Sequence, residues 1–183
     1  MSPSPTPCPH RRPVRVAWSW PATPFHIVLH QPEIPPNTGT IARLCAATGC
    51  PLHLIEPLGF RLTDRALKRA GLDYWDQVTL VRHHSWTAME QALEGHRLFL
   101  FSCGAPVPYT SFTFRPGDAL VFGSESRGLS DDLLERYAGR VGAIPMRPGT
   151  VRSLNLATSV AIVLYEALRQ VASAAPAITP PSP

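Results

Sequence analysis

The chain has 183 residues, of which 44% are hydrophobic and 16% are charged, and its net charge is +4. These proportions are typical of one globular domain with an apolar core, and they exclude a fibrous or wholly disordered protein. The longest apolar run is far below the roughly 20 residues of a membrane-spanning helix, and the N-terminus lacks a secretory signal, so we expect a cytoplasmic protein without a membrane anchor.

The two ends differ in composition from the rest of the chain. Residues 1–24 contain seven prolines and three arginines but no acid, and residues 171–183 contain four prolines and no charge. Such segments bury too little apolar surface to fold, so we expect disordered tails at 1–24 and 171–183 around one domain at 25–170. Outside the first tail the chain has 14 basic and 13 acidic side chains, so the net charge does not by itself predict RNA binding.

Between the tails, apolar runs alternate with helical patterns. The pattern predicts strands at 25–30, 52–56, 77–81, 97–102, 118–123 and 141–145, and helices at 38–48, 63–70, 85–94, 130–137 and 154–170. Helix starts are indicated by Thr63, Ser85 and Ser130, and helix ends by Gly49, Gly71 and Gly95. This alternation predicts an α/β fold, a parallel sheet with helices on both faces.

The cysteines and histidines show no pattern typical of a metal site. Cys8, Cys45, Cys50 and Cys103 form no CxxC pair, so we expect buried or incidental thiols rather than a zinc site or a disulfide framework. His83 and His84 are adjacent, and adjacent side chains point apart on a strand or a helix. We therefore expect no metal.

A parallel sheet binds ligands beyond the carboxyl ends of its strands, and the first such junction is QPEIPPNTGTIARLCAATG, residues 31–49. It lacks the GxGxxG and GxxxxGK[ST] patterns of common nucleotide-binding proteins. Asn37 can cap the following helix, Gly39 permits a close approach, and Arg43 follows about two turns later on roughly the same face. A capped helix with a surface arginine explains this stretch equally well.

Two later junctions are more unusual. In FGSESRGL (122–129), Gly123 and Gly128 free the backbone to wrap a ligand, although a surface loop closed by a salt bridge between Glu125 and Arg127 is an alternative. IPMRPGTVRSLNLATS (144–159) leads from a strand through a Pro-Gly loop to Ser153 and Asn155 at a helix start. Helix capping explains one of these two polar residues but not both, and the backbone of such a loop is free to bond a planar heterocycle.

These three junctions, in this order, resemble the three motifs of the SPOUT methyltransferases, whose sheet is tied into a C-terminal trefoil knot. Residues 25–170 resemble the short TrmL (YibK-like) branch in the stretches IVLHQPEIPPNTGTIARLCAATG, LHLIEPLGF, KRAGLDYW and RSLNLATSVAIVLYEALRQ. The resemblance implies an enzyme that uses S-adenosylmethionine to methylate the 2′-hydroxyl of the wobble nucleotide of tRNA, a cytidine or modified uridine, with leucine tRNAs as expected substrates.

The resemblance also assigns residues. It implies a cofactor pocket formed by Phe101, Ser102, Gly123, Glu125, Gly128, Ile144, Met146, Ser153 and Leu154. It also implies a catalytic group formed by Arg43, Ser153 and Asn155. A guanidinium stays protonated at neutral pH, which makes it a poor general base. Two roles therefore stay open for Arg43, a general base and an electrostatic stabiliser of the reacting hydroxyl. Glu125 is expected to hold either Arg43 or its own loop in place.

Residues 61–71 and 81–86 are basic and lie near Tyr74, Trp75 and Trp86, which suits phosphate contact and stacking on an unpaired base. A solvated helix face with core aromatics is the alternative. The expected RNA contacts are Asn37, Arg65, Lys68, Arg69 and Arg82.

The apolar helix at 154–170 resembles the homodimer interface of this branch. Two other functions stay open: the same chemistry on another tRNA or ribosomal nucleotide, and a binding module that keeps the pocket without turnover.

Overall fold

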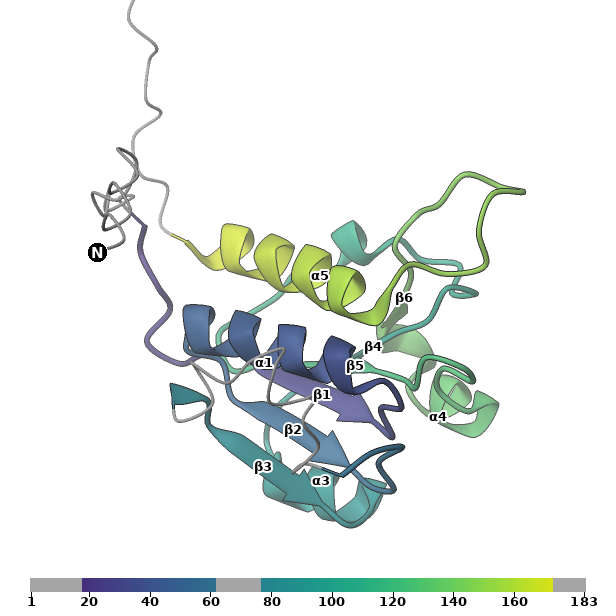
Figure 1. Cartoon of the computed structure of the whole chain (residues 1–183). Coiled ribbons are helices and arrows are strands. Elements are labelled where there is room, and N and C mark those ends of the chain that lie inside the picture. The colour runs from purple at the N-terminus through teal and green to yellow at the C-terminus, as the bar shows by residue number, and fades with distance from the viewer. Residues whose placement is uncertain (1–17, 62–76, 173–183) are drawn as a thin grey trace, which may run out of the picture.

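The computed structural model describes residues 18–61 and 77–172, and its centre is a six-stranded parallel sheet with the order β3-β2-β1-β5-β4-β6 (Figure 1). The strands are β1 (His26–His30), β2 (Leu52–Ile55), β3 (Leu80–His83), β4 (Leu98–Phe101), β5 (Ala119–Phe122) and β6 (Val141–Gly142). The helices are α1 (Pro35–Thr48), α3 (Trp86–Ala92), α4 (Asp131–Arg136) and α5 (Leu156–Val171), with 3-10 turns η2 (Tyr109–Ser111) and η3 (Ala138–Arg140). The predicted parallel α/β sheet is therefore confirmed.

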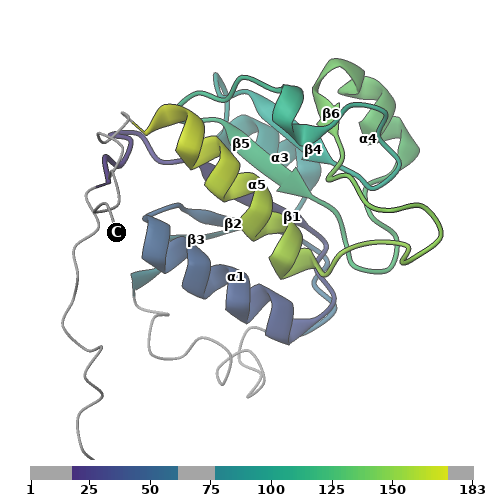
Figure 2. The same ribbon diagram turned by 90° about the horizontal axis from the view of Figure 1, so that it is seen from above.

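Helices cover both faces of the sheet. α1 and α5 lie side by side on one face, and α3 and α4 cover the other (Figures 1 and 2). Successive residues of β1 divide between the two layers, since Ile27 and Leu29 pack under α1 and α5 while Val28 packs under α3. Strands buried on both faces read as continuous apolar runs, which is why the central strands were visible in the sequence.

The first helix begins earlier than its pattern predicted. It starts at Pro35 rather than at residue 38, because proline lacks the N–H that a first turn leaves unused and already has a helical φ. The predicted cap Asn37 is wrong, since Asn37 lies inside the first turn and Ile34 occupies the N-cap position. The end is as predicted, with Gly49 in a left-handed conformation at φ 69°.

Other boundaries shift by a few residues. Ser85 caps α3 by accepting a hydrogen bond from the Ala88 amide at 3.1 Å, as predicted. The strand predicted at 77–81 is β3 at 80–83, and the one predicted at 141–145 shortens to β6. The helix predicted at 63–70, with its signals Thr63 and Gly71, lies outside the described residues.

The C-terminal part places β5 between β1 and β4, and α5 then returns to pack beside α1 (Figure 2). The trefoil knot stays a prediction, as do the domain boundaries at 25 and 170. Most of both predicted tails, residues 1–17 and 173–183, lies outside the described residues. Within residues 18–61 and 77–172, no helix is both long and apolar enough to cross a membrane.

Candidate active site

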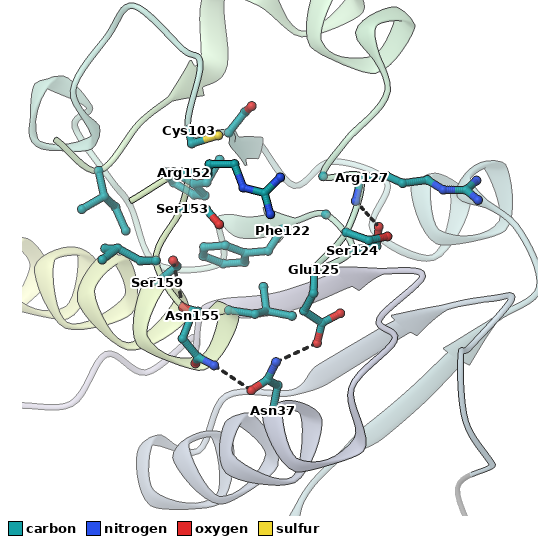
Figure 3. Close-up of a pocket in the computed structure, with 18 of the residues that line it drawn as sticks. Asn37, Cys103, Phe122, Ser124, Glu125, Arg127, Arg152, Ser153, Asn155 and Ser159 are labelled. Carbon is teal, nitrogen blue, oxygen red and sulfur yellow. Dashed lines mark hydrogen bonds between the residues drawn. The ribbon is translucent and has the colours of Figure 1, made fainter. Parts of the chain in front are cut away.

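A pocket of about 780 Å³ opens at the carboxyl ends of β4, β5 and β6, beside the N-termini of α1 and α5 (Figure 3). Its volume falls within the roughly 300–1,000 Å³ of typical small-molecule sites, and its position is the one that open α/β sheets use for ligands. Every residue expected in the cofactor pocket lines it: Phe101, Ser102, Gly123, Glu125, Gly128, Ile144, Met146, Ser153 and Leu154. The structure thus brings these residues together, and their contact with a cofactor stays a prediction.

The glycines of the loop after β5 close it tightly. A Cβ on Gly123 would lie 2.1 Å from the carbonyl carbon of Gly128, so no larger residue fits there without moving the backbone. Ser124 and Gly128 exchange two backbone hydrogen bonds, at 3.3 and 2.9 Å, and Gly128 has a φ of 71°. The two glycines therefore form the neck of a short loop whose residues 124–127 line the pocket.

Glu125 joins this loop to the start of α1. Its carboxylate accepts hydrogen bonds from the Glu33 amide at 2.8 Å, the Ile34 amide at 3.3 Å and the Asn37 side-chain amide at 2.9 Å. The first amides of a helix lack partners within the helix, and a carboxylate is well suited to accept from them. Glu125 and Arg127, both within the described residues, form no ion pair, so the loop is not closed by that salt bridge.

Asn37 and Asn155 continue the connection to α5 (Figure 3). The Asn155 side-chain amide donates to the Asn37 side-chain oxygen at 2.9 Å, while the Asn155 side-chain oxygen accepts from the amides of Ala157 and Thr158 at 2.9 and 3.2 Å. Asn155 therefore caps α5 and binds α1 at once. Asn37, expected to contact RNA, is only 8% exposed, and both ends of its side chain are bonded within the protein.

Several lining residues were not assigned from the sequence: Ile34, Cys103, Phe122, Ser124, Ser126, Arg127, Arg152, Leu156 and Ser159. Phe122 stacks on Phe101 with ring centroids 5.1 Å apart. Arg152 points toward the middle of the pocket in Figure 3, and neither it nor Arg127 pairs with an acid among the described residues. The only sequence signal for Arg152 was its position beside Ser153.

The lining fits S-adenosylmethionine in its chemical composition. Aromatic and aliphatic side chains can enclose an adenine ring, serine hydroxyls can bond ribose oxygens, and arginine can bind a carboxylate. The backbone amides of Ile144 and Met146 bond to no backbone carbonyl within the described residues, which leaves them for a heterocycle. Within the same residues no group of three or more His, Cys, Asp or Glu is placed to hold a metal ion.

Two of the residues expected on the substrate side, Arg43 and Arg82, lie outside the pocket lining. Arg43 is exposed on α1 and does not line the pocket. Arg82 is exposed on β3, where its guanidinium pairs with the Glu56 carboxylate. Arg65, Lys68 and Arg69, like Tyr74 and Trp75, lie outside the described residues.

For Trp86 the sequence left an RNA-facing surface and a place against the core as alternatives, and the structure packs it against the core. Its ring packs between His30, 5.5 Å away, and Tyr137, 5.9 Å away, against the core under α3. A tryptophan beside basic residues in sequence can face either way, and here the ring contacts with His30 and Tyr137 hold it inward.

Large pKa shifts occur outside the pocket, in a chain of histidines across three strands. The ring nitrogens of His26 and His53 are 3.0 Å apart, and those of His53 and His83 are 2.9 Å apart. Burial, reinforced by the neighbouring histidines, lowers the pKa of His53 to about 3 and that of His26 to about 4. Neutral imidazoles have one donor and one acceptor each, so they can form such a chain without charge.

The family model of the SpoU rRNA Methylase family matches residues 24–165. A Methylovorus glucosotrophus protein named tRNA (cytidine(34)-2'-O)-methyltransferase is 48% identical over 147 residues, which cover 80% of this chain and 95% of that protein. A chain solved for structural insights into the 2-OH methylation of C/U34 on tRNA is 52% identical, with a TM-score of 0.77, and the match covers 81% of this chain and 97% of that one. An AdoMet-bound rRNA methyltransferase from Sinorhizobium meliloti is 26% identical, with a TM-score of 0.73, over 85% of this chain and 60% of its own.

Proposed function

The chain belongs to the SpoU rRNA methylase family, and we propose that it methylates the 2′-hydroxyl of nucleotide 34 of tRNA, a cytidine or modified uridine, with S-adenosylmethionine as the methyl donor. The observation that carries this proposal is the match to a tRNA (cytidine(34)-2'-O)-methyltransferase along 95% of its length. The pocket supports it, because all three sequence junctions meet there.

S-adenosylmethionine supplies an electrophilic methyl group, so the protein has to bind it, position the hydroxyl and exclude water. We propose that Ile144, Met146 and Leu154 hold the adenine, since they line the pocket between β6 and α5. Ser153 contacts the ribose of the substrate or the polar end of the cofactor. Asn155 acts through its bonds to Asn37 and α5 rather than by direct contact.

We propose that Arg43 contacts the reacting hydroxyl or the adjacent phosphate. A guanidinium stays protonated near neutral pH, so it suits stabilisation of developing negative charge better than proton removal. Arg43 is exposed on α1 outside the pocket lining, so it reaches the reaction only through a substrate that extends across α1 or through the pocket of a second subunit.

The outer face of α5 supports a homodimer. Tyr165 is 49% exposed, and the partly exposed Ile162 lies one turn earlier on the same face of α5. An apolar face on solvent favours burial against a partner, and α1 with Arg43 lies directly beside it. Tyr165→Asp is expected to yield monomers in sedimentation velocity. A wild-type monomer at micromolar concentration would exclude the dimer.

The preferred substrate is an exposed anticodon loop, because unstacked loop nucleotides can be splayed into a pocket at low cost. We propose leucine-accepting tRNAs as substrates and the cytoplasm as the location. Arg82 and the basic residues Arg65, Lys68 and Arg69 are the proposed phosphate contacts, which predicts a strong salt dependence of tRNA binding.

The test is to incubate the purified protein with methyl-labelled S-adenosylmethionine and isolated leucine-accepting tRNA, and then to map the label by nuclease digestion and mass spectrometry. Label on the ribose of nucleotide 34 supports the proposal. Label on a base, on another tRNA nucleotide or only on ribosomal RNA would overturn the substrate, and no transfer despite cofactor binding would favour a binding module.

A further inference from the structure

A reciprocal pair of carboxylates connects the segment before α1 with the pocket loop after β5. The Glu125 carboxylate accepts from the backbone amides of Glu33 and Ile34. In return, the Glu33 carboxylate accepts from the Ser126 amide at 3.1 Å and from the Ser126 hydroxyl at 2.6 Å. Each acidic side chain therefore binds the backbone of the other's segment.

The Glu33 side of this connection is anchored. The Gly59 amide donates to the Pro32 carbonyl at 3.0 Å, and a Cβ on Gly59 would lie 2.7 Å from the Glu33 Cα. The backbone at Glu33 thus packs directly against the turn after β2. A carboxylate on such an anchored backbone is well suited to fix the position of the loop that donates to it.

The Ser126 side belongs to the pocket. Glu125, Ser126 and Arg127 line it, whereas Glu33 does not. Outside the carboxylate contacts, the loop is held by the bonds between Ser124 and Gly128 at its neck. The tip of the loop is therefore held against the segment before α1 by two carboxylates together, that of Glu125 and that of Glu33.

We propose that Glu33 is a positioning residue, which acts through Ser126 to fix the pocket wall against α1 and thereby sets the affinity for S-adenosylmethionine. This inference rests on the proposed function for the identity of the ligand. Hydrogen bonds to a charged acceptor are stronger than neutral ones, so the loss of two of them is measurable.

The test is a double-mutant cycle on binding of S-adenosylhomocysteine, the demethylated product, measured by calorimetry. Glu33→Ala removes both acceptors, Glu33→Gln keeps one, and Ser126→Ala removes one donor. We expect the Kd to rise about tenfold in Glu33→Ala and about threefold in each of the other two. The double variant Glu33→Ala, Ser126→Ala should bind no more than about twofold weaker than Glu33→Ala alone, because the shared contact is already lost.

Glu94→Ala is the control, because Glu94 is an exposed acid that does not line the pocket, and it should bind as the wild type does. Melting temperatures of all variants show whether a loss of affinity reflects unfolding, and Glu33→Gln and Ser126→Ala keep the test valid if Glu33→Ala is unstable. Wild-type affinity in Glu33→Ala, or losses that simply multiply in the double variant, would overturn the positioning role. Failure of the wild type itself to bind would instead reject the proposed function.

Discussion

The close approach of Gly123 to Gly128 makes a quantitative prediction for Gly123→Ala. The new methyl group would lie 2.1 Å from the Gly128 carbonyl carbon and 2.4 Å from the Leu129 nitrogen. Carbon atoms in contact are normally about 3.5–4.0 Å apart, so the two sides of the loop have to separate by more than about 1 Å. That movement breaks the paired bonds between Ser124 and Gly128, each worth about 0.5–1.5 kcal/mol, and overpacking adds about 1–3 kcal/mol.

If about 3 kcal/mol of this cost is lost from the free energy of cofactor binding, the Kd for S-adenosylhomocysteine rises by about 100-fold. Two other variants separate this clash from general loop sensitivity. Gly128→Ala meets nothing within 4 Å but has a φ of 71°, so it should lose about 1–2 kcal/mol through backbone strain alone. Gly104→Ala, which also meets nothing within 4 Å and has no left-handed φ, should bind normally.

Calorimetry measures the Kd of each variant for S-adenosylhomocysteine, and a thermal melt measures its stability. The expected order of loss is Gly123→Ala, then Gly128→Ala, then Gly104→Ala. Binding by Gly123→Ala equal to that by Gly104→Ala would refute the reasoning, since it would mean that the neck of the loop does not shape the pocket.

Three further outcomes are expected. Arg43→Ala should lower kcat by at least about 100-fold while leaving the Kd for S-adenosylhomocysteine unchanged, because Arg43 lies outside the pocket lining; an equal loss of both would make its role structural. Arg152→Ala should weaken S-adenosylhomocysteine binding or raise the KM for tRNA, since its guanidinium points into the pocket, and no change in either would remove it from the site. The pKa of His53 falls from 6.5 to about 3 on folding, so its stabilisation is complete above pH 6.5 and is lost as the pH falls toward 3. Urea denaturation should show a loss of more than about 2 kcal/mol between pH 7 and pH 5, because the pKa of His26 is lowered as well. His53→Gln should reduce this loss by about 2 kcal/mol, the exposed-site control His84→Gln should retain it in full, and a flat wild-type profile would contradict the prediction.

Much of the fold follows from local patterns. Continuous apolar runs identified all six strands, because strands buried between two helical layers have no polar face. The loop glycines and the Ser-Leu-Asn entry to α5 were recognisable because backbone freedom and helix capping depend on residues close together in sequence. The resemblance then added the cofactor, and the nine residues assigned to its pocket line one cavity.

Other features depend on segments that meet only in the folded chain. The sequence shows that Gly123 permits an unusual backbone, but only the structure shows that Gly128 leaves no room for a side chain. The sequence predicted Asn37 as a helix cap, because capping is an interaction between residues close in sequence. In the structure the side chain of Asn37 instead bonds to Glu125 and Asn155, which lie 88 and 118 residues away. The place of Trp86 stayed open in the sequence for a related reason, since Tyr137, whose ring packs against it, lies 51 residues further along the chain.

By itself, then, the sequence determined the layers of the fold and the three junctions, because these depend on residue type and short spacing, while the resemblance supplied the chemistry of the pocket. The tertiary structure decided which of the three junctions are held together by hydrogen bonds. The bonds between Glu33 and Ser126 join residues 93 positions apart, and the sheet order that brings them together comes from packing of whole strands and helices. A hydrogen bond between distant side chains has no periodicity in the sequence, so it becomes visible only when the fold has placed donor and acceptor within about 3 Å.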